Sequence, residues 1–447
     1  MTSSLMTLLG WFIVFFVAIP LSIGLHELGH LIPAKAFGVK CSQYMIGFGP
    51  TVWSRRKGET EYGVKAVPLG GYVRMIGMFP PKPGQAARAD STGRFALLIE
   101  QARKDANREV GPRDADRLFY QRSVPKKITM MLGGPVMNLL VAVVLITVAV
   151  TVFGTAQTTP RISGVSRCVL PVGEALRDCK PTDTPAPAAT AGLLPGDVIV
   201  AVNGKKVSSW GPARDAIRNS PDKPITVVVD RQGKSVTLTA TPISARREKL
   251  VNGQVVIGKD GKPVTEAVGF LGLSPTTELV PQSITVVPGL VGRSLQSVGG
   301  VLLQLPQKMV GVAQAAFSNQ PRDPTGPVSV VGIGHMVGEV TAETGTPGAP
   351  IGWSDKVAFW LSIIASLNLA LFAFNLIPLL PLDGGHVAGA LWEGLRRQVA
   401  RLRGRPDPGP VDVAKALPLA YGVATLLIGM SVLLMYADIV RPIKLNG

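Results

Sequence analysis

The ten residues "GLHELGHLIP" (24–33) put two histidines and a glutamate near the end of a long apolar run. The run extends from Leu5 to Ile32, and Glu27 is its only charged residue. Because the run is longer than a secretory signal peptide and no basic segment precedes it, we predict a retained transmembrane helix. A charged side chain in the middle of such a helix costs about 2.5–3.5 kcal/mol, which indicates either partners or a function.

Three further apolar runs predict three more membrane spans, at Ile128–Phe153, Val357–Leu380 and Ala416–Val440. Each is long enough to cross a bilayer as a helix. The 447 residues are 46% hydrophobic and only 17% charged. This composition favours a multi-pass membrane protein over a set of soluble domains.

The basic residues predict the orientation of the chain. Lys and Arg are dense in 35–127 and in "RRQVARLRGR" (396–405), and sparser in 154–354. The positive-inside rule therefore predicts that 35–127 and 393–415 are cytoplasmic, with the N-terminus and 154–354 outside. Because the net charge of +17 follows the predicted spans, we expect basic segments facing an anionic inner leaflet and no nucleic-acid partner.

The spacing of His26, Glu27 and His30 predicts a metal site. Residues i and i+4 share one helix face, so both imidazoles can reach one ion. Zinc suits two neutral imidazoles and a carboxylate with a fourth position open for water, and Glu27 is then the general base. The alternative is two incidental histidines on a packed helix.

A third protein ligand is expected near the same depth in the membrane. The third predicted span ends at "NLIPLLPLDGGH" (375–386), where two prolines break the helix. Asp383 is the preferred ligand and His386 the second choice. His335 belongs to the outer loop and is expected to be structural.

Two regions between the spans read as β structure. Residues 44–78 predict short strands with turns at "KGE" (57–59) and "PLGG" (68–71), forming a hairpin that dips into the membrane. In the outer loop, runs at 225–231 and 235–243 joined by "QGK" predict a second hairpin. Cys168 and Cys179 lie in the same loop, where a disulfide can persist, but spacing alone leaves their pairing open.

Four features together resemble the site-2 proteases, intramembrane zinc metalloproteases of the bacterial RseP type. They are "HELGH" (26–30), "GGPVMN" (133–138), one outer module and "NLIPLLPLDGG" (375–385). The resemblance implies that His26, His30 and Asp383 bind Zn2+ and that Glu27 is catalytic. It also implies that Asn138 and Asn375 lie near the substrate, although helix capping or interhelical hydrogen bonding would explain both asparagines equally well.

The outer stretch "GLLPGDVIVAVNGKKV" (192–207) resembles bacterial PDZ domains, which bind extended C-terminal peptides by strand addition. A gate that excludes uncut substrates is the preferred interpretation, and a peptide receptor is the second. The expected substrates are single-span membrane proteins such as anti-sigma factors, first cut outside the membrane. Their cleavage would release a cytoplasmic fragment.

The predicted fold class is a membrane α-helical protein with four transmembrane helices, a membrane-associated β-hairpin or sheet and one extracytoplasmic PDZ-like β-rich domain. The predicted segments are transmembrane helix 1 (1–36), the cytoplasmic β region and polar insert (37–127), helix 2 (128–154), the PDZ-like domain (155–278), an outer amphipathic connector on the membrane surface (279–354), helix 3 (355–392), a basic cytoplasmic loop (393–415), and helix 4 with the C-terminus (416–447).

Two other functions remain open on sequence grounds. A metal transporter would need ionisable residues in several spans, and the middles of the second and fourth spans have none. A membrane scaffold without activity would be expected to lack one of the catalytic-type groups, yet all of them are present. Loss of substrate cleavage on Glu27→Ala separates the protease from both.

Overall fold

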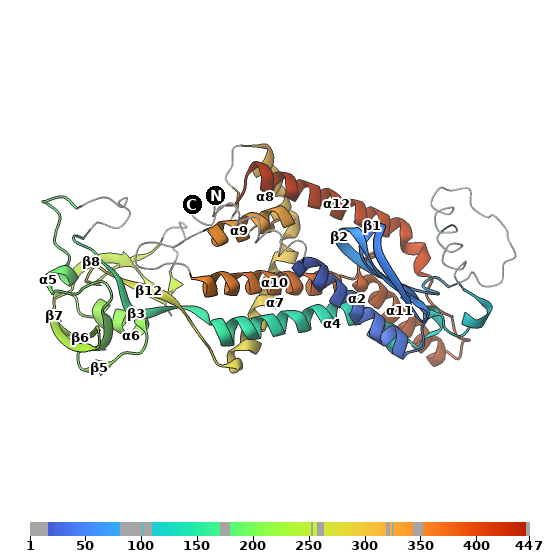
Figure 1. Cartoon of the computed structure of the whole chain (residues 1–447), viewed down its shortest axis with the longest axis horizontal. Helices are drawn as coiled ribbons and strands as arrows, with labels where there is room; N and C mark the ends of the chain where they lie inside the picture. The colour runs from blue at the N-terminus through green and yellow to red at the C-terminus, as the bar shows by residue number, and fades with distance from the viewer. Residues whose placement is uncertain are drawn as a thin grey trace. The chain divides into compact units, whose positions relative to one another are not determined.

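The computed structural model describes residues 17–80, 101, 110–169, 179–251, 254–256, 263–318, 322–323, 326–342 and 352–443. The chain divides into two compact units. A helical unit comprises Met1–Val152, Ser283–Glu343 and Trp353–Gly447, and a β-rich unit comprises Phe153–Gln282 and Thr344–Gly352. Both can be followed in Figure 1.

The helical unit contains long apolar helices joined by short elements. In chain order its elements are α2 (Ile19–Ala36), β1 (Cys41–Lys57), β2 (Thr60–Met75), η2 (Pro112–Asp114), η3 (Phe119–Gln121), α4 (Val124–Val148), η4 (Ala149–Phe153), η5 (Ile284–Val286), α7 (Val287–Leu303), α8 (Leu305–Phe317), α9 (Val330–Ala342), α10 (Trp353–Asn375), α11 (Asp383–Leu402), η6 (Val413–Ala416) and α12 (Leu417–Val440).

Four helical stretches of the described residues are long and apolar enough to cross a membrane: Val124–Phe153, Ile284–Leu303, Trp353–Asn375 and Val413–Val440. Three of them coincide with the second, third and fourth predicted spans. The other contains α7, in a segment expected to lie on the membrane surface, and it too has the length and composition of a span. Much of the predicted first span lies outside the described residues, and α2 is its described part.

Helix α4 is the central element of the helical unit, because α2, α10 and α11 all pack against it. The crossing with α2 is close because both helices present glycine. A Cβ on Gly29 would collide with the carbonyl of Gly133, and a Cβ on Gly133 with the carbonyl of Gly29. Small residues allow this kind of approach between membrane helices. The crossing brings the HELGH and GGPVMN segments together.

Strands β1 and β2 form an antiparallel hairpin around Gly58 that folds back on itself, so that residues 43–46 pair with 71–74 on one side and with 61–64 on the other. The folded hairpin packs on α2. The predicted turn at "KGE" is confirmed, with Gly58 in the left-handed region (φ 63°). Residues 68–71 are assigned to β2, but the chain reverses direction there as the predicted "PLGG" turn requires, because residues 61–64 run parallel to 43–46 whereas 71–75 run antiparallel to 41–46. Tyr44 of β1 donates a hydrogen bond to the carbonyl of Gly24 (2.6 Å), which fastens the hairpin to α2.

The β-rich unit is built on a sheet of order β12-β3-β4-β6-β7, with β5 paired to β4. Its elements are β3 (Thr155–Val165), α5 (Pro187–Thr190), β4 (Val198–Val202), β5 (Lys205–Lys206), α6 (Trp210–Arg218), β6 (Ile225–Arg231), β7 (Lys234–Ala240), β8 (Ile243–Glu248), β9 (Leu250–Val251), β10 (Gln254–Val255), β11 (Thr265–Phe270) and β12 (Leu273–Val280).

The hairpin predicted around "QGK" is confirmed as β6–β7. Gln232 and Gly233 both have positive φ, 54° and 81°, as a type I′ turn requires. Along β6, Ile225, Val227 and Val229 alternate into the core of the unit. Cys168 and Cys179 form a disulfide with a Cα–Cα distance of 5.8 Å, so the pairing that spacing left open is present in the structure.

Candidate metal centre

Helix α2 carries the first two groups of the site. His26 and His30 lie one helical turn apart, and their Nε2 atoms are 3.2 Å from each other. His30 is buried, and the side chain of His26 is 13% exposed. The helix therefore aims both imidazoles at one point, as the i, i+4 spacing predicts.

Asp383 reaches the same point from the other end of the sequence. Helix α10 ends at Asn375, the chain turns through Pro378 and Pro381, and Asp383 is the first residue of α11. Its Oδ2 atom lies 3.3 Å from Nε2 of His26 and 3.3 Å from Nε2 of His30. The described residues thus form one group of three side chains that could hold a metal ion.

The outer nitrogens of the two imidazoles both face α4. His30 Nδ1 lies 2.8 Å from the carbonyl oxygen of Met130. Because a carbonyl only accepts hydrogen bonds, Nδ1 carries the ring proton and Nε2 keeps its lone pair. The amide nitrogen of Asn138 lies 3.0 Å from His26 Nδ1, and the Asn138 side chain is fully buried.

The three converging atoms have the spacing of metal ligands. Zinc binds imidazole nitrogen and carboxylate oxygen at about 2.0–2.2 Å in tetrahedral sites, and such bonds separate neighbouring ligand atoms by about 3.3–3.6 Å. The distances here are 3.2, 3.3 and 3.3 Å. Asp383 Oδ2 is also buried and accepts no hydrogen bond in the described part of the chain. A buried acceptor beside a lone pair needs a cation, so these residues fit zinc.

Gly134 of α4 forms the wall behind the imidazoles, a role that the sequence analysis missed. A Cβ at this position would lie 2.7 Å from Cε1 and 2.8 Å from Nε2 of His26, and would also collide with Nε2 of His30. The glycine pair of "GGPVMN" indicated a close approach of another group to this helix. Only the crossing of α2 and α4 decides that the imidazoles occupy the space beside Gly134.

Glu27 is buried on α2 beside the cluster. Its electrostatic neighbours are His26, His30 and Asp383, together with the backbone of Val73 in β2. Strand β2 passes directly by its side chain, since a Cβ on Gly71 would lie 3.0 Å from Glu27 Cγ. The carboxylate therefore lies between the three candidate ligands and the β hairpin.

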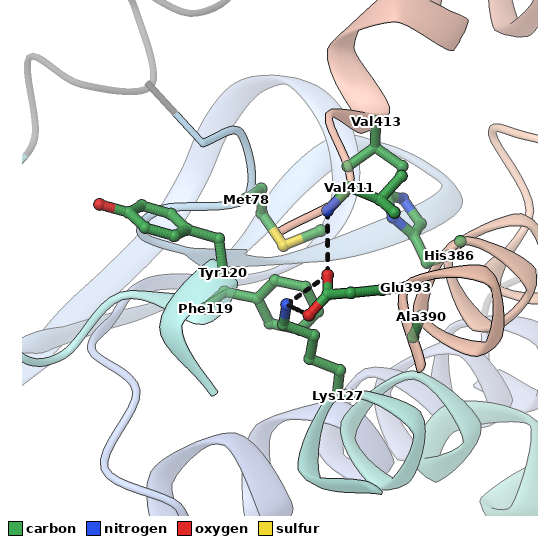
Figure 2. Close-up of a pocket in the computed structure, with 10 residues that line it drawn as sticks. Met78, Phe119, Tyr120, Lys127, His386, Ala390, Glu393, Val411 and Val413 are labelled. Carbon is green, nitrogen blue, oxygen red and sulfur yellow. Dashed lines mark hydrogen bonds and ion pairs between the residues drawn. The ribbon is translucent and has the colours of Figure 1, made fainter. Parts of the chain in front are cut away.

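The remaining predicted residues lie elsewhere. Asn375 is the half-buried last residue of α10, and the described contacts do not join its side chain to the cluster. His386 does not belong to the group of three residues that could hold a metal ion. It lines a cavity of about 20 Å³ beside Lys127 and Glu393 (Figure 2). His335 is exposed on α9.

A membrane-spanning helical unit that holds two histidines and an aspartate around one point, beside a buried glutamate, defines the class of membrane-embedded metallopeptidases. Comparison with known proteins agrees. The model of peptidase family M50 matches residues 14–406, and the chain belongs to this family.

The chain is also similar to proteins that are named as metalloproteases. The zinc metalloprotease Rip1 of Mycobacterium tuberculosis is 36% identical over 442 residues, covering 97% of this chain and 98% of the relative. Rip1 of Mycolicibacterium smegmatis is 32% identical, with 97% and 98% covered. The metalloprotease MmpA of Caulobacter vibrioides is 28% identical, with 84% of each chain covered. The chain is thus a zinc metalloprotease of the site-2 family and a multi-pass membrane protein.

Proposed function

We propose that this protein cleaves transmembrane segments of single-span regulators, such as anti-sigma factors, after a first cut outside the membrane. Cleavage releases a cytoplasmic fragment that acts in stress signalling. The observation that carries the proposal is the convergence of His26, His30 and Asp383 within 4.8 Å beside Glu27, in a unit of membrane-spanning helices. A protease centre at that location requires a substrate that is itself in the bilayer.

In this proposal His26, His30 and Asp383 hold the zinc ion. Met130 keeps His30 in the tautomer that offers Nε2. Asn138 does the same for His26 when its amide oxygen faces Nδ1, because Nδ1 then carries the ring proton and Nε2 keeps its lone pair. Rotation of the buried amide by 180° achieves this. Asn138 thereby acts first on the ligand, a role that differs from the substrate contact implied by the resemblance.

Zinc bound here supplies Lewis-acid activation of water and of the scissile carbonyl. Glu27 takes the proton of the attacking water on its carboxylate and passes it to the departing amide nitrogen. A helical peptide bond is shielded by its own hydrogen bonds, so the substrate must first unwind. We propose that the unwound segment pairs with the β1–β2 hairpin, whose Gly71 lies against Glu27, and that Asn375 contacts it at the end of α10.

The orientation proposed is an extracytoplasmic N-terminus and β-rich unit, with the zinc site toward the cytoplasmic side of the plasma or inner membrane. We propose that the β-rich unit is a PDZ-like gate that excludes substrates with intact outer domains. If the β-rich unit instead binds peptides, a free C-terminal peptide should bind the full-length protease and inhibit cleavage of the substrate.

The test uses two tagged single-span substrates, one with a bulky outer domain and one lacking it, co-expressed with wild type or with Glu27→Gln. We expect a cytoplasmic fragment only from the trimmed substrate and only with wild type. The matched control is Glu278→Gln, a half-exposed glutamate of the β-rich unit, which should cleave like wild type. Equal cleavage by wild type and Glu27→Gln would reject the catalytic assignment, and equal cleavage of both substrates would reject the gate.

A further inference from the structure

Helix α11 has two contrasting faces. Gly384, Ala390 and Glu393 are buried, and the helix packs on α4. The other face is apolar but exposed. Five arginines lie in the second half of the helix and in the residues that directly follow it. Its exposed apolar side chains recur at intervals of three or four residues: Leu391 (57% exposed), Leu395 (50%), Val399 (37%) and Leu402 (81%).

The chain around α11 locates this face at a membrane surface. Helix α10 before it and the helix Val413–Val440 after it are both candidate spans. A connection between two consecutive spans begins and ends at the same side of the bilayer, so residues 376–412 lie at one surface. An exposed apolar stripe flanked by basic residues at such a surface is the pattern of a helix that lies in the interface.

A cavity of about 310 Å³ opens beside the stripe. One wall is apolar and is formed by Trp392, Leu395 and Val399, facing prolines of the following loop. Arg396, Arg403 and Arg405 contribute the basic groups of the lining. Helical geometry explains the arrangement, because Arg396 and Arg403 are seven residues apart and follow one edge of the apolar stripe.

Among the described residues, no carboxylate forms an ion pair with the arginines that line this cavity. The nearby carboxylate of Asp407 pairs with Arg397, and Arg397 does not line the cavity. Arg396 does donate a hydrogen bond to the carbonyl of Pro408 (3.3 Å), which holds the loop over the cavity.

We propose that this cavity binds the head group of an anionic phospholipid. Guanidinium groups match phosphate oxygens in charge and geometry, while the apolar wall of Trp392, Leu395 and Val399 accommodates the first part of an acyl chain. The membrane is the occupant that this surface favours, because the apolar stripe and the basic rim face the same interface. Each arginine near an anionic leaflet strengthens binding about fivefold.

The experiment measures lipids retained by the purified full-length protein in native mass spectrometry, with phosphatidylglycerol or phosphatidylcholine added at equal concentration. We expect wild type to retain phosphatidylglycerol preferentially. The variant Arg396→Gln/Arg403→Gln/Arg405→Gln should lose at least about tenfold of that preference. The control Arg401→Gln/Lys205→Gln/Lys206→Gln removes equal charge from exposed positions outside the cavity, including one on α11, and should bind like wild type.

A second measurement does not depend on removing charge. Brominated phosphatidylglycerol should quench more tryptophan fluorescence in wild type than in Trp392→Phe, and brominated phosphatidylcholine should show a smaller difference. Unchanged lipid preference in the arginine variant, or an equal loss in the control, would overturn the proposal. So would a dimer in the mass spectra that the arginine variant abolishes, because a second copy would then occupy this face.

Discussion

Helix α11 contributes one carboxylate to each of two polar clusters, one with Lys127 of α4 and one with the two histidines of α2, and the two clusters are built differently. At one, Glu393 accepts hydrogen bonds from Lys127 Nζ at 2.8 Å through both oxygens and from the Val411 N–H at 3.1 Å (Figure 2). Arg397 adds an ion pair to Glu393 at 3.2 Å. At the other, Asp383 Oδ2 is directed at two imidazole nitrogens and accepts no hydrogen bond within the described residues.

The hydrogen-bond partners of the two carboxylates indicate a structural role for Glu393 and a metal-binding role for Asp383. A buried carboxylate surrounded by donors is satisfied, and its role is to join the segments that supply them. A buried carboxylate that faces lone pairs is satisfied only when a cation arrives. The first cluster therefore holds α11 against α4, and the second uses that arrangement to bring three candidate ligands together. Each can be perturbed separately.

The largest effect is expected at the unsatisfied cluster. Asp383→Ala removes one of three protein ligands, so zinc content should fall from about one ion per chain to near zero. Elemental analysis of the purified, dialysed protein measures this. Glu393→Gln, a buried carboxylate of the same helix, should retain its zinc in the folded fraction. If Asp383→Ala still contained about one zinc ion per chain, Asp383 would not be a zinc ligand and the contrast with Glu393 would be wrong.

Breaking the satisfied cluster should cost stability instead. Glu393→Gln leaves Lys127 buried without its counter-charge, so we expect a loss of about 3–5 kcal/mol in the free energy of unfolding. Denaturation of the detergent-solubilised protein measures it. Replacing both partners, with Lys127→Met and Glu393→Leu, should cost less than the single change, because no lone buried charge remains. A larger loss in the double variant would contradict this reading.

Two positions on α4 test how closely the ligands are held. Asn138→Ala should weaken zinc binding about 10–100-fold, because His26 loses the group that orients its ring. Competition with a chelator gives the affinity, and Asn138→Asp should restore part of it by accepting from Nδ1. An unchanged zinc affinity in Asn138→Ala would mean that Asn138 does not orient His26, and a contact with the substrate would then be the better explanation of this residue.

Gly134→Ala should lower the zinc affinity by a similar factor, since its methyl group occupies the space of both imidazoles. Gly292→Ala on α7 is the matched control, because a Cβ there has no neighbour within 4 Å. A normal affinity in Gly134→Ala would mean that the α2–α4 crossing opens without disturbing the ligands.

The smallest effect is expected at a satisfied pair in the β-rich unit. Asp197 is buried and accepts a bidentate pair of hydrogen bonds from Arg231, at 2.8 Å to each oxygen. Burial by itself would raise the Asp197 pKa, but Arg231 and the Leu194 N–H outweigh it and hold the pKa below its ordinary value. Asp197→Asn should therefore cost about 1 kcal/mol near neutral pH.

The sign of the pH dependence follows from the lowered pKa. Stability from the ionised Asp197 is present above its unfolded pKa of about 3.9 and is lost as pH falls through the lower folded value. Hydrogen exchange of β4 and β6 amides in the full-length protein should show wild type more protected than Asp197→Asn at pH 6. The difference should shrink below about pH 4, and a difference that grows instead would reverse the assignment.

Local patterns were sufficient for some parts of this protein. The i, i+4 spacing of His26 and His30, the "QGK" hairpin and three apolar runs depend on neighbours in sequence, so periodicity and turn chemistry predicted them. The "PLGG" turn also appears as a reversal of the chain within β2, but pairing with both sides of residues 43–46, which no local pattern predicts, makes the whole stretch part of a strand. The prolines at 378 and 381 correctly marked the break between α10 and α11.

By itself, the sequence predicted a membrane protein with an HExxH helix and, from the expected depth of the third span's end, Asp383 as the preferred third ligand, which the resemblance also implied. Only the tertiary structure decided that Gly134 makes room for the imidazoles, that Asn138 meets His26 and that Lys127 joins Glu393, 266 residues away in sequence. The physical reason is that helical periodicity specifies which residues share a face, whereas the crossing of two helices specifies which faces meet.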